Sequence, residues 1–560
     1  MFGLPARHFN KRRAEMVPTS PLVLNRNEQE DKAEFEKYDI VIVGGGITGA
    51  YCAYDAVLRG YRVALIEKSD FASGTSSKSS KMVHGGLRYI EQGNIGLVRH
   101  SLHERQRLRR NAPHLVQRLP FLFPVMEREG IFDARLAKAF EGLLWTYDLA
   151  GGWREGILHQ KLTKAEVISH CPTFNETYLK SGLMYFDARV DDARLTLTLA
   201  RSAAYFGATI LNHTKVTQMV RRENKVVGVV AVTSDGREIA VESKSVIMAT
   251  GVWLRDWSGA ANESEKKIHI RPAKGVHVAI PWIKIRNDCT VTIPVPGRSR
   301  RATITRWGNV SYLGTTDEDY DGDLDNIYCT RRELDFLLEG ANSALTTDLT
   351  CDDVVGSIAG CRPLVASSNG TTMDAKRNHE IHVAADGLVT IVGGKLTTSR
   401  FMAEQTINAV QKVLGSNRKC RTKKAYLLGG AGYDAQSVVA GGGIEAHLAE
   451  RYGNEAQFVS AIMQDNPDYM KPIVEGLAYT EAEVVYAVRH EMALTVDDVL
   501  SRRMRARIMA RDASARAAGR VGQIIQKELG LTSDVIAAQV SSYIAETQKE
   551  KSYLLGEKND

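Results

Sequence analysis

Three glycines and an acidic residue near the start of the chain have the types and spacing needed to hold a dinucleotide. Gly44, Gly46 and Gly49 form a G-x-G-x-x-G turn. The first glycine permits a tight turn, the second lets the backbone approach a pyrophosphate at a helix N-terminus, and the third lets helix and strand pack closely. Glu67 follows about 20 residues on, where a carboxylate can bind adenosine ribose hydroxyls. These residues predict a dinucleotide site, but NAD and FAD share this half of the molecule, so the turn cannot separate them.

Such a turn needs a strand before it and a helix after it, and the sequence predicts both. The β-branched run at 38–43 is typical of a buried parallel strand, and 47–58 has helical apolar spacing. A second strand is expected at 62–66. Together they predict a βαβ unit that opens an α/β sheet.

Two later segments favour a flavin. Ala249-Thr-Gly251 closes a strand expected at 245–249 and resembles the return strand of many flavoproteins with two dinucleotide domains. The glycine-rich turn at 392–398 joins a strand to a helix expected from about 398 to 410. The positive N-terminal end of that helix suits the negative charge of a reduced flavin, although a simply capped helix would have the same sequence.

The remaining elements predict an α/β fold with two further parts. A strand is expected at 226–232, alternating apolar residues between 268 and 313 indicate an antiparallel sheet, and helical spacing returns at 481–490 and 496–527. We therefore expect a flexible N-terminal extension at 1–36, a discontinuous cofactor domain at 37–430 with a substrate domain inserted mainly at 256–355, and a C-terminal helical domain at 431–560.

Composition narrows the function classes. The chain has 560 residues, 44% apolar and 25% charged, which is typical of a globular protein with a sizeable core. Its seven cysteines form no C-x-x-C pair, so neither a zinc site nor a disulfide framework is predicted, and a reducing cytoplasmic compartment fits. We find no signal peptide and no run of about 18 apolar residues. The net charge of +7 is spread without an aromatic platform, which argues against nucleic-acid binding.

A third segment carries a specific family resemblance. Residues 74–89 read Gly-Thr-Ser-Ser-Lys-Ser-Ser-Lys-Met-Val-His-Gly-Gly-Leu-Arg-Tyr, and with them the chain is similar to the FAD-dependent glycerol-3-phosphate dehydrogenase family. The similarity continues in motifs at 185–194, 274–277, 314–317, 360–364, 393–398 and 495–503. It implies a glutathione-reductase-like FAD-binding domain, an inserted antiparallel-sheet substrate domain and a helical C-terminal domain. It also implies oxidation of sn-glycerol 3-phosphate at carbon 2 to dihydroxyacetone phosphate, with electrons passed to a quinone of the respiratory chain.

The resemblance assigns candidate residues to each role. A phosphomonoester needs charged donors, and arginine forks suit it best. Thr315 and Arg377 are expected at the phosphate, and Arg88 and Arg362 near the glycerol hydroxyls and the reacting carbon. His277 is the expected base, because the carbon-2 hydroxyl must lose a proton as the hydride leaves. Tyr89 and Lys395 are further substrate-binding candidates. The expected FAD-binding residues are Gly44, Gly46, Gly49, Glu67, Thr75, Ser76, Ser77, Gly251, Gly393, Gly394, Leu396 and Thr397.

Family members are commonly peripheral proteins on the cytoplasmic face of the membrane, and a homodimer is compatible with the resemblance. The stretch 132–147 places Phe132, Leu136, Phe140, Leu143, Leu144 and Tyr147 at helical spacing, with Arg135 and Lys138 able to face lipid head groups. Core packing explains the same spacing more often. The acidic run at 317–322 starts like a calcium loop but has Tyr328 where the last ligand should be, so we expect no metal.

Three alternatives stay open. A glycerol-3-phosphate oxidase would share the fold, flavin and substrate motifs but reduce oxygen. An amine or amino-acid oxidase would bind a carboxylate and want fewer arginines than this chain offers. A non-catalytic dinucleotide-binding regulator would keep the glycine turn and lose the substrate residues, which are present here.

Overall fold

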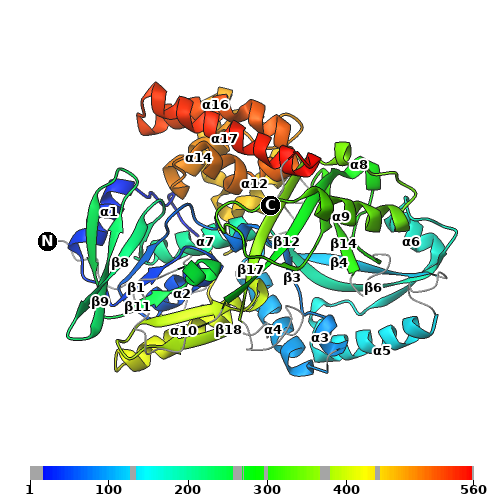
Figure 1. Cartoon of the computed structure of the whole chain (residues 1–560), viewed down its shortest axis with the longest axis horizontal. Helices are drawn as coiled ribbons and strands as arrows, with labels where there is room; N and C mark the ends of the chain where they lie inside the picture. Colours follow the sequence, from blue (N-terminus) through cyan, green and yellow to red (C-terminus); the bar gives the residue numbers. More distant parts are fainter. Residues whose placement is uncertain are drawn as a thin grey trace.

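The computed structural model describes residues 17–91, 93–126, 134–256, 268, 270–294, 301–365, 379–434 and 442–557. Two large sheets lie side by side, and helices from the C-terminal part lie across them (Figure 1). The expected α/β cofactor domain, antiparallel-sheet domain and helical domain are all present.

A six-stranded sheet forms the first part. Its order is β18 (His379–Val383), β19 (Val389–Gly393), β11 (Val246–Met248), β1 (Ile40–Val43), β2 (Val63–Ile66) and β7 (Thr209–Leu211). All neighbours are parallel except β18 and β19. Val43 pairs with both Ile66 and Met248, so β1, β2 and β11 end at one edge of the sheet. The residues that follow them are thereby brought together, as is usual for ligand sites of parallel sheets.

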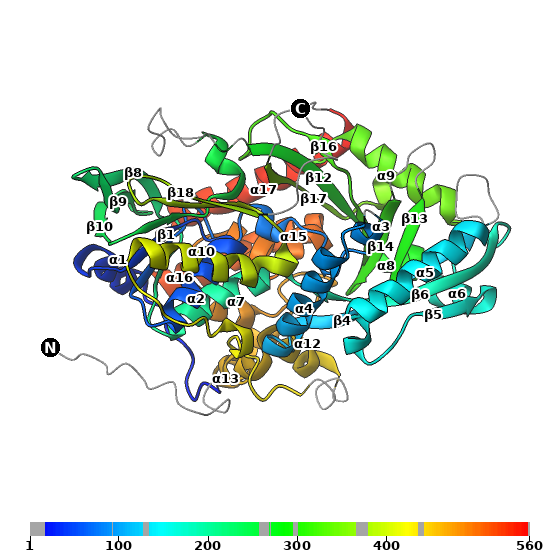
Figure 2. The same ribbon diagram turned by 90° about the horizontal axis from the view of Figure 1, so that it is seen from below.

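Both faces of this sheet are covered, which explains its continuous apolar strands. The helices α2 (Ile47–Leu58), α7 (Asp192–Tyr205) and α10 (Ser399–Val413) lie together on one face (Figure 2). A three-stranded sheet of β8 (Lys215–Arg222), β9 (Lys225–Val232) and β10 (Glu238–Glu242) packs on the other. Ile40 and Ile42 contact the helices, and Val41 and Val43 contact the smaller sheet.

The second large sheet is mixed and mainly antiparallel. Its main path is β16 (Glu318–Asp319), β12 (Ile270–Pro281), β15 (Val310–Gly314), β14 (Arg301–Trp307), β13 (Thr290–Pro294), β4 (Val116–Met126), β6 (Leu179–Val190) and β3 (Met82–Val83); β17 (Gly356–Val365) pairs with β12, and β5 (Gln160–Thr163) with β6. The sheet therefore extends beyond the expected insertion at 256–355. The apolar run of β4, with Pro120 and Pro124, lacks the alternation that indicated the later strands. Helices of different lengths flank this sheet: α3 (Arg88–Glu91), α4 (Ile95–Asn111), α6 (Lys164–His170), α8 (Trp282–Ile285) and α9 (Arg331–Ala344).

The C-terminal part is helical, as expected. It comprises α12 (Gly443–Tyr452), α13 (Ala456–Asp465), α14 (Glu481–Glu491), α15 (Ala506–Met509), α16 (Arg511–Leu529) and α17 (Ser533–Leu555). The expected helix at 496–527 is interrupted, because a π-helical turn, Asp498–Arg503, precedes α15.

Buried ion pairs join this part to the cofactor domain. Arg503 lies 2.6 Å from Asp70 and Arg201 lies 2.8 Å from Glu455, and Arg194 also pairs with Glu491. In each pair one member comes from the helical part and the other from the cofactor domain. These pairs satisfy charges that would be costly to bury alone.

The chain before β1 is more ordered than the sequence indicated. Helix α1, Arg26–Phe35, starts at the N-cap Asn25 and buries Ala33 against the β8–β10 sheet. Its Arg26 donates to the side chain of Asn212 at 2.6 Å. The expected flexible extension at 1–36 is wrong for this segment, because polar contacts rather than an apolar stripe hold the helix.

Helix α5, Ala134–Ala150, covers most of the stretch 132–147, for which helical apolar spacing was expected. Phe140, Leu144 and Tyr147 are buried in a cluster with Phe121 and other core residues. These side chains therefore face the core, as core packing predicts, and do not support the alternative that they face lipid. Phe132 and the side chains of Arg135 and Leu136 lie outside the described residues. No helix in the described ranges is long and apolar enough to span a bilayer.

Candidate active site

A cavity of about 460 Å³ starts at the glycine turn after β1 and ends at β12 and β17 of the second sheet. Gly44 has φ +110°, and a Cβ there would lie 2.5 Å from the carbonyl oxygen of Ala249. A Cβ on Gly49 would overlap the Gly44 carbonyl. Gly44 and Gly46 line the cavity, whereas Gly49 lies behind the turn and keeps helix and strand in contact. The turn thus has the close packing that a dinucleotide turn requires.

Glu67 lies beside this turn, at the end of β2. Its carboxylate accepts hydrogen bonds from the backbone N–H of Gly45, at 2.6 Å, and of Ser69, at 2.9 Å. Burial raises the pKa of Glu67, and the two N–H donors oppose that shift. The side chain lines the cavity, in the position expected for a ribose ligand.

Further cofactor candidates surround the middle of the cavity. Ser76 accepts a hydrogen bond from the N–H of Ile47 at 2.8 Å, and Thr75 donates to the carbonyl of Cys361 at 2.6 Å. Thr75, Ser76 and Gly251 line the cavity. Ser77 is buried beside it and its carbonyl accepts from Arg505 at 2.6 Å, so it supports the loop from behind.

The turn after β19 forms another wall. Gly393 and Gly394 have φ near +80°, at +79° and +84°, which brings the backbone of this turn to the cavity. The Lys395 ammonium lies 3.8 Å from the centre of the Tyr89 ring. Thr397 accepts a hydrogen bond from the N–H of His84 at 3.1 Å. Leu396 also lines the cavity, and α10 begins three residues later, as the sequence predicted.

His277 lies on β12 at the far end of the cavity and is almost fully buried. Its Nε2 lies 2.9 Å from the Ser80 hydroxyl, and its ring stacks on Tyr312 with centroids 4.6 Å apart. Gly314 pairs with His277 across the strands, and a Cβ on Gly314 would overlap the imidazole. Burial lowers the pKa of His277 well below its usual range, and the charges of Lys81 and Arg362 act in the same direction.

Arg362 lies on β17, next to β12. It donates to Asp317 at 3.1 Å and to the Thr315 hydroxyl at 3.2 Å. A Cβ on Gly275 would lie 2.7 Å from the guanidinium, so the glycine leaves space for this side chain. Arg362 lines the cavity and remains 28% exposed, whereas Thr315 is not among the lining residues.

The structure thus brings together 14 of the candidates, of both kinds, in one cavity: Gly44, Gly46, Glu67, Thr75, Ser76, Tyr89, Gly251, His277, Arg362, Gly393, Gly394, Lys395, Leu396 and Thr397. Arg377 and the Arg88 side chain lie outside the described residues. Several polar lining residues were missed, and Lys78, Ser80 and His84 are three of them. All three belong to the motif at 74–89, so the signal was present in the sequence, but their contacts depend on distant strands.

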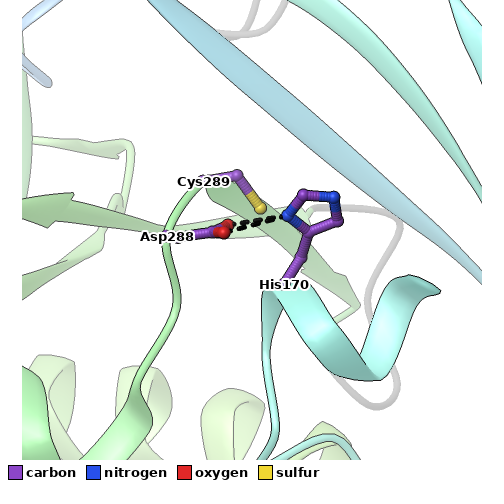
Figure 3. A group of neighbouring side chains, drawn as sticks. All are labelled: His170, Asp288 and Cys289. Atoms are coloured by element: carbon purple, nitrogen blue, oxygen red, sulfur yellow. Dashed lines mark hydrogen bonds and ion pairs between the residues drawn. The ribbon is translucent and has the colours of Figure 1, made fainter. Parts of the chain in front are cut away.

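Two groups of side chains in the described ranges bring possible metal ligands within 4.8 Å of one another, and neither lines the cavity. In Asp70–His213–Asp498, Arg502 and Arg503 donate to the carboxylates. In the other group, His170 Nδ1 lies 2.9 Å from Asp288, and the Cys289 sulfur lies beside them (Figure 3). Both have the contacts of ordinary ion pairs.

The residues of the cavity fit a flavin dinucleotide. Its glycine turn and buried carboxylate suit the adenosine half, and the turn at Gly393–Gly394 suits the ring end. The cavity continues from these backbone walls to His277 and Arg362, where a substrate would meet the ring.

Comparisons with known proteins agree with this geometry. The family model described as "FAD dependent oxidoreductase" matches residues 39–400, and that described as "C-terminal domain of alpha-glycerophosphate oxidase" matches residues 420–535. A protein of Mycobacterium leprae named glycerol-3-phosphate dehydrogenase is 39% identical over 92% of this chain and 89% of its own length. A Dictyostelium discoideum protein named probable mitochondrial glycerol-3-phosphate dehydrogenase is 33% identical over 87% of this chain and 80% of its own.

A solved structure supports the same assignment. The glycerol-3-phosphate dehydrogenase of Bacillus halodurans, complexed with FAD, is 27% identical and superposes with a TM-score of 0.75, covering 94% of this chain and 97% of that one. The α-glycerophosphate oxidase of Mycoplasma pneumoniae, at 19% identity and a TM-score of 0.53, shares the fold. The family match, the shared length and the cavity lead to one conclusion: this chain belongs to the FAD-dependent glycerol-3-phosphate dehydrogenase family.

Proposed function

We propose that this protein oxidises sn-glycerol 3-phosphate at carbon 2 to dihydroxyacetone phosphate and passes the electrons to a quinone-type acceptor. The observation that carries the proposal is the single cavity that joins the glycine turn and Glu67 to His277 and Arg362. When bound there, FAD supplies an acceptor for the hydride that leaves carbon 2. The protein must then bind the phosphate, orient the carbon and remove the hydroxyl proton.

His277 is the proposed base. Because burial keeps its pKa low, the imidazole is neutral near pH 7 and can accept a proton from the carbon-2 hydroxyl. The Ser80 hydroxyl and the stacked Tyr312 ring hold the imidazole in one orientation. Arg362 is close enough to affect His277 electrostatically, and the same charge would stabilise an alkoxide as the proton leaves.

Cationic side chains give the substrate end of the cavity a positive charge that suits a phosphomonoester. Arg362, Lys395 and Lys78 all line the cavity. We assign Arg362 and Arg88 to the glycerol hydroxyls and reacting carbon, Arg377 and Thr315 to the phosphate, and Tyr89 and Lys395 to positioning of the substrate. Thr315 accepts a hydrogen bond from Arg362, which supports a position for Thr315 next to the substrate end of the cavity.

The proposals of a quinone acceptor and of membrane contact are based on the exposed surface of α5 and the turn after it. Trp145 and Leu149 are exposed on the outer face of α5, and Trp153 is exposed in the following turn, with Arg154 placed over its ring at 4.7 Å. Exposed tryptophans next to cations are typical of membrane-interface contacts. We therefore propose peripheral attachment to the cytoplasmic face of a membrane, where a quinone is available.

The reaction is tested by the visible spectrum of the flavoprotein under anaerobic conditions. Glycerol 3-phosphate should bleach the flavin band, whereas glycerol and amino acids should not. A flavin that stays oxidised would contradict the proposed substrate. After admission of air, stoichiometric peroxide would favour the oxidase alternative, and reoxidation by a soluble quinone would favour the dehydrogenase.

Membrane contact is tested separately with anionic liposomes. The Leu149→Gln and Trp153→Gln double variant should sediment with liposomes several-fold less than the unaltered protein. Tyr178→Gln, a change at another exposed apolar side chain, is the control. Equal sedimentation of all three proteins would exclude this surface.

A further inference from the structure

A second cavity, of about 650 Å³, lies between the second sheet and the C-terminal helices. Its walls come from β4, β6 and β14 on one side and from α12 and the loop at 476–479 on the other. Ser80 lines both this cavity and the active-site cavity. Tyr312, which stacks on His277, also lines it. The two cavities are thus separated by the residues that hold the proposed base.

Two arginines that line this second cavity have no carboxylate partner, unlike several fully buried arginines of the described chain. Arg189 bonds only to the neutral side chain of Gln117, at 2.6 Å and 3.1 Å. Arg306 donates to the carbonyl of Gly308 at 3.4 Å and lies over the Trp282 ring at 4.2 Å. Within the described part of the chain, neither guanidinium has a carboxylate within 4.0 Å. By contrast, the buried arginines Arg194, Arg201, Arg400 and Arg503 all pair with a carboxylate.

These two guanidinium groups also repel each other. Burial lowers the pKa of Arg189, and the charge of Arg306 adds to the shift. Glu450 attracts Arg189 from more than 4.0 Å and outweighs the repulsion by Arg306, but burial has the largest effect and the pKa stays lowered. A guanidinium that is taken out of water without a carboxylate contact favours an anion bound beside it.

The rest of the lining indicates what kind of anion would bind. Asp288 and Asp191 already have partners, since Asp288 lies 2.9 Å from His170 Nδ1 and Asp191 lies 4.0 Å from Arg451. Glu450 is left to accept hydrogen bonds from a ligand, and the Trp307 and Tyr312 rings form an aromatic wall crossed by the Lys81 ammonium. Guanidinium forks suit phosphate, and a carboxylate suits hydroxyl groups.

We infer that this second cavity binds a phosphorylated, hydroxyl-bearing metabolite through Arg189 and Arg306, and that its occupancy alters the reactivity of His277 through Ser80 and Tyr312. Binding does not depend on the proposed reaction, whereas the effect on turnover rests on it. A ligand bound here would not compete with the substrate, because the cavities share a wall rather than a volume.

Titration calorimetry of the FAD-loaded protein tests the binding. Ribose 5-phosphate is a suitable probe, with inorganic phosphate as the simplest anion, and the same titration of Arg362→Gln shows how much of the heat comes from the active-site cavity. We expect one equivalent of ribose 5-phosphate to bind, and Arg189→Gln and Arg306→Gln each to weaken it by about tenfold or more. Arg286→Gln is the matched control, because Arg286 is exposed and donates only to the Ile283 carbonyl.

Binding heat that is absent, or unchanged in both variants, would overturn the inference. If Arg189→Gln does not fold, the partly exposed Arg306 still decides the question. In steady-state assays ribose 5-phosphate should change kcat for glycerol 3-phosphate oxidation in the unaltered protein but not in Arg306→Gln. A purely competitive effect, equal in both proteins, would place the probe in the active site and exclude the second cavity. Loss of activity in every protein with intact probe binding would instead contradict the proposed reaction alone.

Discussion

The two ends of the active-site cavity are built in different ways. The cofactor end is made by backbone: Gly44, Gly46 and the turn at Gly393–Gly394 come close to the cavity because they have no side chains to exclude it. The substrate end is made by side chains, with His277 and Arg362 carried by neighbouring strands. A backbone wall tolerates no added atom, whereas a side-chain wall can lose one group and keep its shape.

The strongest test of this difference is Gly49→Ala. A Cβ at this position would overlap the Gly44 carbonyl, and this backbone group belongs to the turn and cannot move away without changing it. We expect a loss of about 3 kcal/mol or more in stability and most of the bound flavin. The ratio of flavin to protein absorbance and the urea midpoint measure both.

Gly519→Ala is the control for that change. Gly519 also lies inside a helix, but nothing lies within 4 Å of its would-be Cβ. The substitution should stabilise the protein by about 0.5–1 kcal/mol. Similar behaviour of the two variants would mean that the turn is not tightly constrained.

At the substrate end, His277→Ala should leave the flavin bound and lower kcat by about 10²–10⁴-fold, because the hydroxyl proton then lacks an acceptor. Stopped-flow reduction of the flavin by glycerol 3-phosphate measures this step directly. A near-normal rate would remove His277 as the base.

Arg362→Gln should have a smaller effect, mainly on substrate affinity. Loss of one charge-assisted contact costs about 1.5–3 kcal/mol, and we expect the dissociation constant for the substrate to rise accordingly. Arg271→Gln is the control, because Arg271 lies on the adjacent strand and pairs with Asp319 at the surface. An unchanged substrate affinity with reduced turnover would mean that Arg362 does not bind the substrate and only stabilises the alkoxide that forms as the proton leaves.

The smallest expected change is the change in stability per pH unit, and it comes from a residue outside both ends of the cavity. Burial lowers the pKa of His114 to about 3, below its usual value of about 6.5. The unfolded chain therefore binds a proton that the folded chain does not, so stability should fall as the pH drops from 6.5 towards 3, by up to about 1.4 kcal/mol per pH unit. His277, whose pKa is also lowered, contributes with the same sign.

His114→Phe should reduce that slope when urea unfolding is compared at pH 7 and pH 5. Well above pH 6.5 neither histidine contributes a pH dependence, because each is then neutral in both the folded and the unfolded state. If the substitution leaves the change in unfolding free energy between pH 7 and pH 5 unaltered, other groups determine the loss of stability in acid.

Local patterns predicted the backbone-built end well. The turn, α2, the edge at Ala249 and the start of α10 all follow from residues that are neighbours in sequence. The side-chain end needed family resemblance, because the contact between Ser80 and His277 joins residues 197 positions apart. Two features were missed for the same reason. Pairing with distant strands places β3 to β6 in the second sheet, and polar contacts with distant residues hold helix α1.

The ion pairs between the helical part and the cofactor domain have a consequence for how this protein can be recombined. Asp70 and Arg194 obtain their counter-charges from Arg503 and Glu491. A C-terminal part taken from a relative would have to bring the same charges to the same places, since one unmatched buried ion costs several kcal/mol. The two parts therefore have to be exchanged together. A chimera joined near residue 430 should fold only if both parents have the same charges at each of these buried ion pairs.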